Sequence, residues 1–270
     1  MKIAVTGGTG FLGQHVMKIF SERDIHVTYT LRNQSSGSHF LKNNNSVLMD
    51  IYSPPSNIFE TLGKPDVLLH LAWGGLPNYN SLHHFSEELF AQYNFLSHLI
   101  EQGLPALVST GTCLEYGMEE GALSAEMRTY PTNPYGFAKD SLCKQLMYLQ
   151  ANQFFSFTWA RLFYMYGTGQ AENSLFTSLK MAVERGDRVF KMSEGEQLRD
   201  FLPVEDVAKS LVDLTIQADN KGVINICSGQ PISIRQLVEQ WIDENNWDIE
   251  LALNEYPYPD YEPFAFWGVT

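Results

Sequence analysis

A tyrosine and a lysine, Tyr135 and Lys139, lie four residues apart in the segment NPYGFAK. This spacing is about one helical turn, so the phenol and the ammonium face the same side of a helix. A tyrosine is a poor proton donor or base at neutral pH because its unperturbed pKa is about 10. A neighbouring ammonium stabilises the phenolate and lowers that pKa, which makes the pair suited to proton transfer.

A glycine-rich segment near the N-terminus, VTGGTGFLG, predicts a binding site for cofactor phosphates. It follows a short apolar run and opens a helix whose apolar face includes Phe11 and Leu12. Gly7, Gly10 and Gly13 allow a sharp turn and let a pyrophosphate approach the backbone N–H groups of the helix N-terminus. The order strand, turn, helix is the context that distinguishes a dinucleotide site from a purely structural turn.

The end of the second predicted strand indicates which dinucleotide is bound. An NAD site usually carries Asp or Glu about 20 residues after the glycines, where it holds the ribose 2′-hydroxyl. The sequence there, YTLRN, contains no acid. Thr30 and Arg32 can instead hydrogen-bond and neutralise a 2′-phosphate, although a solvated surface arginine is the alternative. The sequence therefore favours NADP over NAD.

Composition limits the class of protein and its partners. The 270 residues include 18 Lys and Arg against 31 Asp and Glu, a net charge of −13, which argues against nucleic acid and anionic membranes as partners. Three cysteines without framework spacing fit a reducing compartment, and no zinc-ligand spacing is present. The most apolar stretch is interrupted by Arg161 and is too short to span a bilayer. We expect a cytoplasmic protein that is not embedded in a membrane and carries no metal.

Short apolar runs alternate with helical patterns, which is typical of βαβ units and a parallel sheet. Six strands are predicted, at 2–6, 25–30, 46–49, 66–71, 104–110 and 156–163. A helix over 81–102 is predicted from apolar residues on one face: Phe85, Leu89, Tyr93, Leu96 and Ile100. Pro134 near its first position opens another, over about 134–152.

The alternation predicts an α/β fold, a Rossmann-type doubly wound parallel sheet with a smaller C-terminal lobe. The dinucleotide-binding domain is expected over 1–166 and the substrate lobe over 167–270. A helix from about Pro203 and a strand at 223–227 indicate that about 200–228 returns to the first domain. A further helix is expected near 174–185, and another from about 233.

Taken together, these motifs resemble the extended short-chain dehydrogenase/reductase family, particularly its nucleotide-sugar epimerase and reductase branch. The segments TGGTGFLG, HLAW, STGTCLEYG, NPYGFAK, ARLFYMYGTGQ and RDFLPVEDVA are similar to motifs of that family, in the same order along nearly the whole chain. Asn94 matches an asparagine of the family's central helix. Relatives build a four-helix dimer bundle from that helix and the Tyr/Lys helix, so the resemblance implies a homodimer.

The resemblance also implies roles for individual residues. Thr112 would hydrogen-bond the reacting oxygen, Tyr135 would transfer the proton, and Lys139 would hold the nicotinamide ribose. The implied cofactor-binding residues are Gly7, Gly10, Phe11, Leu12, Gly13, Thr30, Arg32, Asp50, Ile51, Leu71, Ala72, Tyr135 and Lys139. The implied substrate-binding residues are Thr112, Gln170, Asn173 and Arg199, the last on the nucleotide diphosphate.

Departures from the family pattern limit which of the family's reactions we expect this chain to catalyse. Cys113 and Leu114 stand where 4,6-dehydratases carry an Asp-Glu pair, so dehydration is not expected. Tyr164 replaces an asparagine that often contacts substrate. The favoured hypothesis is NADPH-dependent reduction of the 4-keto group of a nucleotide-activated 4-keto-6-deoxy sugar. A nucleotide-sugar 4-epimerase that retains NAD and a non-catalytic NADP-sensing protein are the alternatives. The sequence specifies neither the nucleotide, the sugar nor the product stereochemistry.

Overall fold

The fold is seen in a computed structural model that describes residues 1–32, 44–259 and 262–270. Among these residues, seven strands form one sheet in which every neighbouring pair is parallel. In spatial order they are β12 (Gly222–Ile226), β7 (Ser156–Leu162), β5 (Ala106–Thr112), β4 (Val67–His70), β1 (Ile3–Thr6), β2 (Val27–Leu31) and β3 (Asn45–Leu48). Strand order reverses between β1 and β4, which is where such sheets bind ligands.

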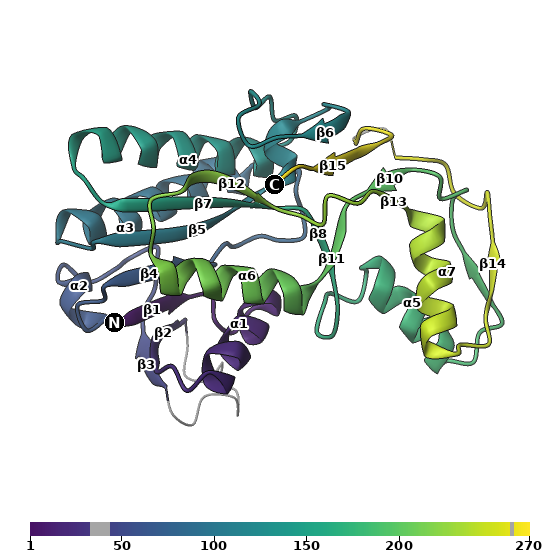
Figure 1. Cartoon of the computed structure of the whole chain (residues 1–270), viewed down its shortest axis with the longest axis horizontal. Coiled ribbons are helices and arrows are strands. Elements are labelled where there is room, and N and C mark those ends of the chain that lie inside the picture. Colours follow the sequence, from purple (N-terminus) through teal and green to yellow (C-terminus); the bar gives the residue numbers. More distant parts are fainter. Residues whose placement is uncertain (33–43, 260–261) are drawn as a thin grey trace.

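Helices cover both faces of this sheet, as Figure 1 shows. On one face, α1 (Phe11–Glu22) packs beside α6 (Val204–Gln217), and their apolar residues share a core with β1, β2 and β4. On the other face, α3 (Leu89–Glu101), α4 (Pro134–Asn152) and the short α2 (Ile58–Thr61) enclose a second core around Phe95, Leu142 and Trp159. The predicted Rossmann-type doubly wound fold is confirmed.

The predicted helix over 81–102 differs from the structure in one informative way. It begins with a π-helical turn, η3 (His84–Glu88), before the regular helix α3. Because a π turn contains an extra residue, it rotates the preceding positions relative to the α-helical face. Phe85, expected on the buried face, is therefore exposed, whereas the polar residues His84 and Glu88 are buried.

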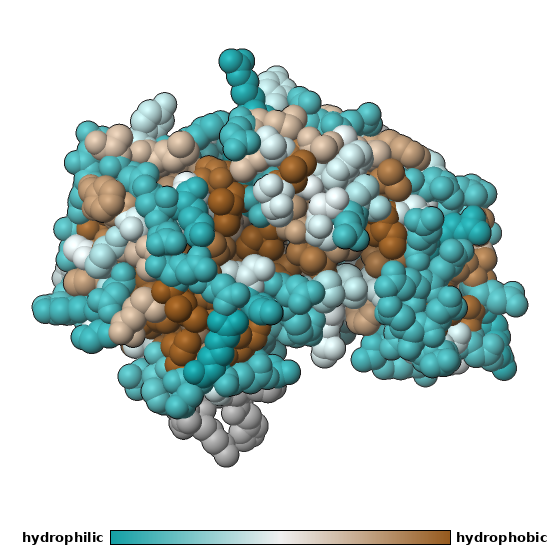
Figure 2. Space-filling model, in the orientation of Figure 1, coloured by the Kyte–Doolittle hydropathy of each residue, from teal (hydrophilic) through white to brown (hydrophobic). Residues whose placement is uncertain are grey.

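Segments of the chain beyond β7 build the smaller lobe at the right of Figure 1. There α5 (Leu175–Glu184) and α7 (Ile234–Asn245) pack around Leu179 and Trp241, and β9 (Val189–Lys191) pairs with β14 (Glu250–Ala252). Figure 2 shows hydrophilic residues over most of this lobe's visible surface. Three further pairs lie between lobe and sheet: β8 (Tyr164–Tyr166) with β11 (Phe201–Pro203), β10 (Leu198–Arg199) with β13 (Ile232–Ser233), and β6 (Gly121–Leu123) with β15 (Phe266–Gly268).

Candidate active site

A cavity of about 300 Å³ lies at the carboxyl ends of the central strands. Its wall contains residues that follow β1, β2, β3 and β4, together with residues of η3 and α3. Of the predicted cofactor residues, six line it: Gly7, Thr30, Arg32, Asp50, Ile51 and Ala72. The volume and the position at the reversal of strand order suit part of a dinucleotide.

The glycine turn beside this cavity has the conformation that the sequence predicts. Gly7 has φ +74°, and the Gly10 N–H donates to the Gly7 carbonyl over 3.0 Å before α1 begins at Phe11. A Cβ on Gly13 would lie 2.1 Å from the Gly7 oxygen, so a side chain cannot be accommodated there. The turn thus presents bare backbone at a helix N-terminus, which fits a pyrophosphate.

Some predicted cofactor residues support the site without lining the cavity. Gly10 and Gly13 shape the turn, and Leu12 and Leu71 pack against the core of that face of the sheet. The Phe11 ring, at the first position of α1, packs edge-on against His15. The sequence missed other wall residues, namely Thr9, Met49, Tyr52, Trp73, Gly74, Glu88 and Gln92. Asn94, which matches an asparagine in the central helix of the family, lies in α3 and is exposed.

Tyr135 and Lys139 occupy the first turns of α4, whose N-terminus is capped by the Asn133 side chain. Both are buried. Aromatic groups surround the Tyr135 ring, with centroid distances of 5.3 Å to His84, 5.4 Å to Tyr79 and 5.9 Å to Trp73. The Lys139 Nζ lies 4.2 Å from the centroid of the Trp73 ring, a cation–π contact. Trp73 therefore connects Tyr135 and Lys139 to the cavity wall.

The electrostatics of the pair differ from the expectation that Lys139 lowers the tyrosine pKa. Burial raises the pKa of Tyr135, and the nearby Tyr79, Glu115 and Cys113 raise it further. Burial also lowers the pKa of Lys139 to about 8. Desolvation is the largest cause of both shifts because burial penalises the charged form of each group. Burial thus favours the protonated phenol, which is the form required to donate a proton.

Thr112 ends β5 and caps the short helical turn η4 (Cys113–Tyr116). Its side-chain oxygen accepts from the Leu114 N–H over 3.3 Å, and its own N–H donates to Glu115 over 2.9 Å. This reciprocal capping box fixes the backbone of Thr112. The Thr112 side chain also forms a hydrogen bond with the neighbouring Cys113 side chain.

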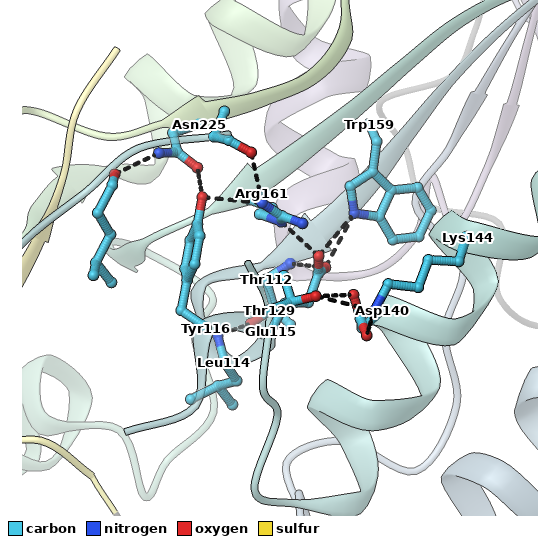
Figure 3. A network of polar contacts seen from close by, with 12 residues as sticks. Thr112, Leu114, Glu115, Tyr116, Thr129, Asp140, Lys144, Trp159, Arg161 and Asn225 are labelled. Atoms are coloured by element: carbon cyan, nitrogen blue, oxygen red, sulfur yellow. Dashed lines mark hydrogen bonds and ion pairs between the residues drawn. The ribbon is translucent and has the colours of Figure 1, made fainter. Parts of the chain in front are cut away.

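Figure 3 shows the buried network that holds this turn. The Arg161 Nε donates to Glu115 over 2.6 Å, and the Trp159 indole donates to the same carboxylate over 3.0 Å. Arg161 also donates to the Tyr116 hydroxyl, which in turn donates to Asn225 over 2.6 Å. Burial raises the pKa of Glu115, and the charge of Arg161 opposes that rise. The network connects β5, β7 and β12.

No carboxylate directly follows Thr112 that could exchange protons as an Asp-Glu pair would. Cys113 is buried, and burial raises the pKa of its thiol. Leu114 is apolar, and the next carboxylate, Glu115, is completely buried and committed to Arg161 and Trp159. That the chain does not catalyse dehydration stays a prediction.

The predicted substrate residues lie on the lobe side and have different surroundings. The Gln170 amide donates to the Met165 carbonyl over 3.0 Å, and Asn173 is exposed. Arg199 is buried and pairs with Glu262 over 3.0 Å, while Tyr164 donates to the other oxygen of that carboxylate over 2.7 Å. The arginine predicted to hold a diphosphate thus contacts a carboxylate of the C-terminal segment here. Its role toward substrate stays a prediction.

In residues 1–32, 44–259 and 262–270, no group of three or more His, Cys, Asp or Glu could hold a metal ion. In the same ranges, no helix is both long and apolar enough to cross a membrane.

Comparisons with known proteins agree with this geometry. The model of the NAD dependent epimerase/dehydratase family matches residues 3–227. Among relatives, the dTDP-6-deoxy-L-talose 4-dehydrogenase (NAD(+)) of Aggregatibacter actinomycetemcomitans is 29% identical, covering 99% of each chain. The GDP-6-deoxy-D-talose 4-dehydrogenase of the same organism is 26% identical over 94% of this chain and 84% of its own.

A solved structure shares the fold over the full chain. MoeE5, in complex with UDP-glucuronic acid and NAD, has a TM-score of 0.82 and 24% identity, covering 100% of this chain and 90% of its own. The fold, the glycine turn, the Tyr/Lys pair and the family match lead to one conclusion. The chain belongs to the NAD dependent epimerase/dehydratase family and is an enzyme of the extended short-chain dehydrogenase/reductase type.

Proposed function

We propose that the chain reduces the 4-keto group of a nucleotide-activated 4-keto-6-deoxy sugar, using a nicotinamide dinucleotide. The observation that carries this proposal is a buried Tyr135 one turn from Lys139 on α4, packed against Trp73 of the cavity wall, with no acid–base carboxylate directly after Thr112. Two relatives named as 6-deoxy-talose 4-dehydrogenases support it, since 4-keto reduction is the reverse of 4-dehydrogenation.

The bound dinucleotide would supply the hydride that C4 accepts. Tyr135 would then give its phenolic proton to the developing alkoxide, so that the ketone becomes a hydroxyl. Thr112 would donate a hydrogen bond to the same oxygen and hold it in place. Lys139 would bind the nicotinamide ribose and stabilise the tyrosinate that remains after proton transfer. Gln170, Asn173 and Arg199 stay the proposed substrate contacts from the part of the chain after β7.

The cofactor proposal rests on the edge of the cavity where Thr30 and Arg32 lie. One relative is named as an NAD(+) enzyme and the solved neighbour is a complex with NAD, which argues against a requirement for NADP. We propose that Arg32 lets the chain accept NADPH in addition to NADH by contacting the 2′-phosphate.

The experiment is to incubate the purified chain with NADH or NADPH and dTDP-, CDP-, GDP- and UDP-linked 4-keto-6-deoxy sugars. One or more of these should be reduced, with one cofactor oxidised per sugar consumed. A 4-epimerase would instead retain NAD and turn over a 4-hydroxy sugar without added cofactor. Recovery of one NAD per denatured chain with such turnover would decide for epimerisation.

We also propose a homodimer through α3 and α4. Large apolar side chains are exposed on these helices, including Phe90 at 67% and Phe137 at 50%. The rings of Phe85 and Phe137 already contact edge to face, with centroids 6.2 Å apart. Light scattering should give twice the chain mass for the native protein and the monomer mass for a Phe90→Glu/Phe137→Glu variant. A native monomer at micromolar concentration would contradict the proposal.

A further inference from the structure

Three polar side chains run along the buried side of η3 and α3 at intervals of four residues: His84, Glu88 and Gln92. Helical residues four apart lie on one face, and this face contacts α4, which carries Tyr135 and Lys139. Two of the three, Glu88 and Gln92, line the cofactor cavity. The π turn that presents this stripe is a feature found often at functional sites.

Glu88 is the charged member of the stripe, and its side chain is completely buried. One carboxylate oxygen accepts from the Gln92 amide over 2.8 Å, and the other lies 3.3 Å from the Nε2 of His83, which is 30% exposed. A Cβ on Gly74 would lie 2.2 Å from the Glu88 Oε1, so the chain uses glycine where the carboxylate packs on the backbone. The Glu88 carboxylate therefore packs directly against the backbone at Gly74.

A buried carboxylate is costly unless a cation compensates it. The other carboxylate near Lys139, Glu115, has such a partner because Arg161 donates to it directly. Glu88 has only a neutral amide and a partly exposed imidazole as hydrogen-bond partners. Lys139, in turn, is a buried cation whose Nζ lies over the Trp73 ring, and Trp73 lines the cavity. Two buried, opposite charges thus lie at this part of the cavity wall, Glu88 directly and Lys139 behind Trp73.

We propose that Glu88 is the electrostatic partner of Lys139 and keeps the catalytic ammonium charged and positioned beside the cofactor cavity. Glu88 is a positioning residue in this role, since it acts through Lys139. The inference deepens the proposed function, because it concerns the lysine assigned there to the nicotinamide ribose.

The other groups that face Lys139 do not replace Glu88. Glu115 favours the ammonium most and Glu88 next, but the Glu115 carboxylate already forms a direct ion pair with Arg161. Burial lowers the pKa of His70 to about 3 and also lowers the pKa of His84, so both imidazoles are neutral near pH 7. Burial raises the pKa of the Cys143 thiol, which is neutral as well. The Trp73 and Trp159 rings contact the ammonium but carry no charge.

The test is the pH dependence of NADH binding, followed by fluorescence, which requires no sugar substrate. Native protein should lose affinity as the pH rises through about 8, where Lys139 loses its proton. Glu88→Gln should move that loss about one pH unit or more toward acid, because an opposite charge within reach shifts a pKa by roughly that amount. Lys139→Met should bind NADH weakly and should lack this pH-dependent loss of affinity, which we call the pH step.

A neighbouring residue offers a matched control. Glu87 lies on the same π turn and is 64% exposed, so Glu87→Gln should leave the step at its native pH. Glu88→Asp keeps the charge and should restore the native step. An unchanged step in Glu88→Gln, or the same shift in Glu87→Gln, would overturn the proposal. Failure of every keto sugar to react would instead count against the proposed reaction alone.

Stability provides a second readout, which also covers a variant that folds poorly. If the two charges compensate each other, Lys139→Met should lower the urea midpoint, and adding Glu88→Gln should recover part of the loss. Adding Glu87→Gln to Lys139→Met should recover none. Simple additivity of the Glu88 and Lys139 substitutions would contradict the pairing.

Discussion

Buried charged groups on the two sides of α4 have different kinds of partners. Toward β5 and β7, the Glu115 carboxylate is paired with Arg161 and receives further bonds from Trp159 and Thr112. Toward the cavity, Lys139 contacts a tryptophan ring, and Glu88 has only an amide and an imidazole as partners. The first side has its polar groups satisfied by the fold. On the second side neither Lys139 nor Glu88 has a lysine- or arginine-to-carboxylate contact among the described residues, and it is there that we propose the residues that act on the ligand.

The largest expected effect is on the cavity side and concerns the rate alone. Tyr135→Phe removes only the phenolic hydroxyl and keeps the ring that packs against Trp73, Tyr79 and His84. We expect the fold and cofactor affinity to stay near native and the rate to fall by roughly 10²–10⁴-fold, as for loss of a general acid. Steady-state kinetics and a cofactor titration measure the two quantities. Near-native turnover would remove Tyr135 from its proposed role.

On the opposite side, the expected effect is on stability. Glu115→Gln leaves the buried Arg161 guanidinium without its counter-charge, so the free energy of unfolding should fall by about 3–5 kcal/mol. Urea unfolding measures this, and the double substitution Glu115→Gln/Arg161→Met should recover part of the loss. A change below about 1 kcal/mol would show that the network is not the structural anchor that its contacts indicate.

A smaller effect is expected at the adenosine end of the cavity. Arg32→Ala should weaken NADPH binding by about 1–3 kcal/mol, as for loss of a charge-assisted hydrogen bond, and should change NADH binding little. Titrations of both dinucleotides against both proteins test this selectivity. Equal losses of affinity for NADH and NADPH would show that Arg32 does not bind the 2′-phosphate.

The smallest effect is expected at the solvent edge of the network in Figure 3. Lys144 is 53% exposed and forms an ion pair with Asp140 over 2.6 Å, one turn along α4. Because solvent screens such pairs, Lys144→Ala should cost no more than about 0.5 kcal/mol. Thermal unfolding of the Lys144→Ala and Glu115→Gln variants, measured side by side, compares the two losses of stability. A loss as large as that of Glu115→Gln would erase the difference between the buried and exposed parts of the network.

The sequence predicted the fold well because each strand and helix has a strong local pattern. The glycine turn, the apolar strand runs and Pro134 at the start of α4 give local signals that packing does not reverse. The polar stripe was missed because His84, Glu88 and Gln92 belong to a helix whose apolar periodicity dominates. A π turn cannot be recognised from that periodicity. Because of it, Phe85 is exposed although it was expected on the buried face, and Glu88 is buried.

The electrostatics of the site were also beyond the sequence. The spacing of Tyr135 and Lys139 predicted their shared face but not their burial, and burial decides the direction in which each pKa moves. Likewise, the pairing of Glu115 with Arg161 joins residues 46 positions apart. Its only sequence signal is the presence of one acid and one base at the ends of adjoining strands.

The central claim, hydride delivery to a sugar C4 with Tyr135 as proton donor, can be tested by isotope labelling. The chain would be incubated with nicotinamide cofactor deuterated at the transferable position of C4 and with the keto sugar that it reduces best. The account predicts a product one mass unit heavier, with deuterium located at sugar C4 by NMR, and roughly 10²–10⁴-fold slower formation in Tyr135→Phe. A product without deuterium at C4, or formed without net cofactor oxidation, would contradict it.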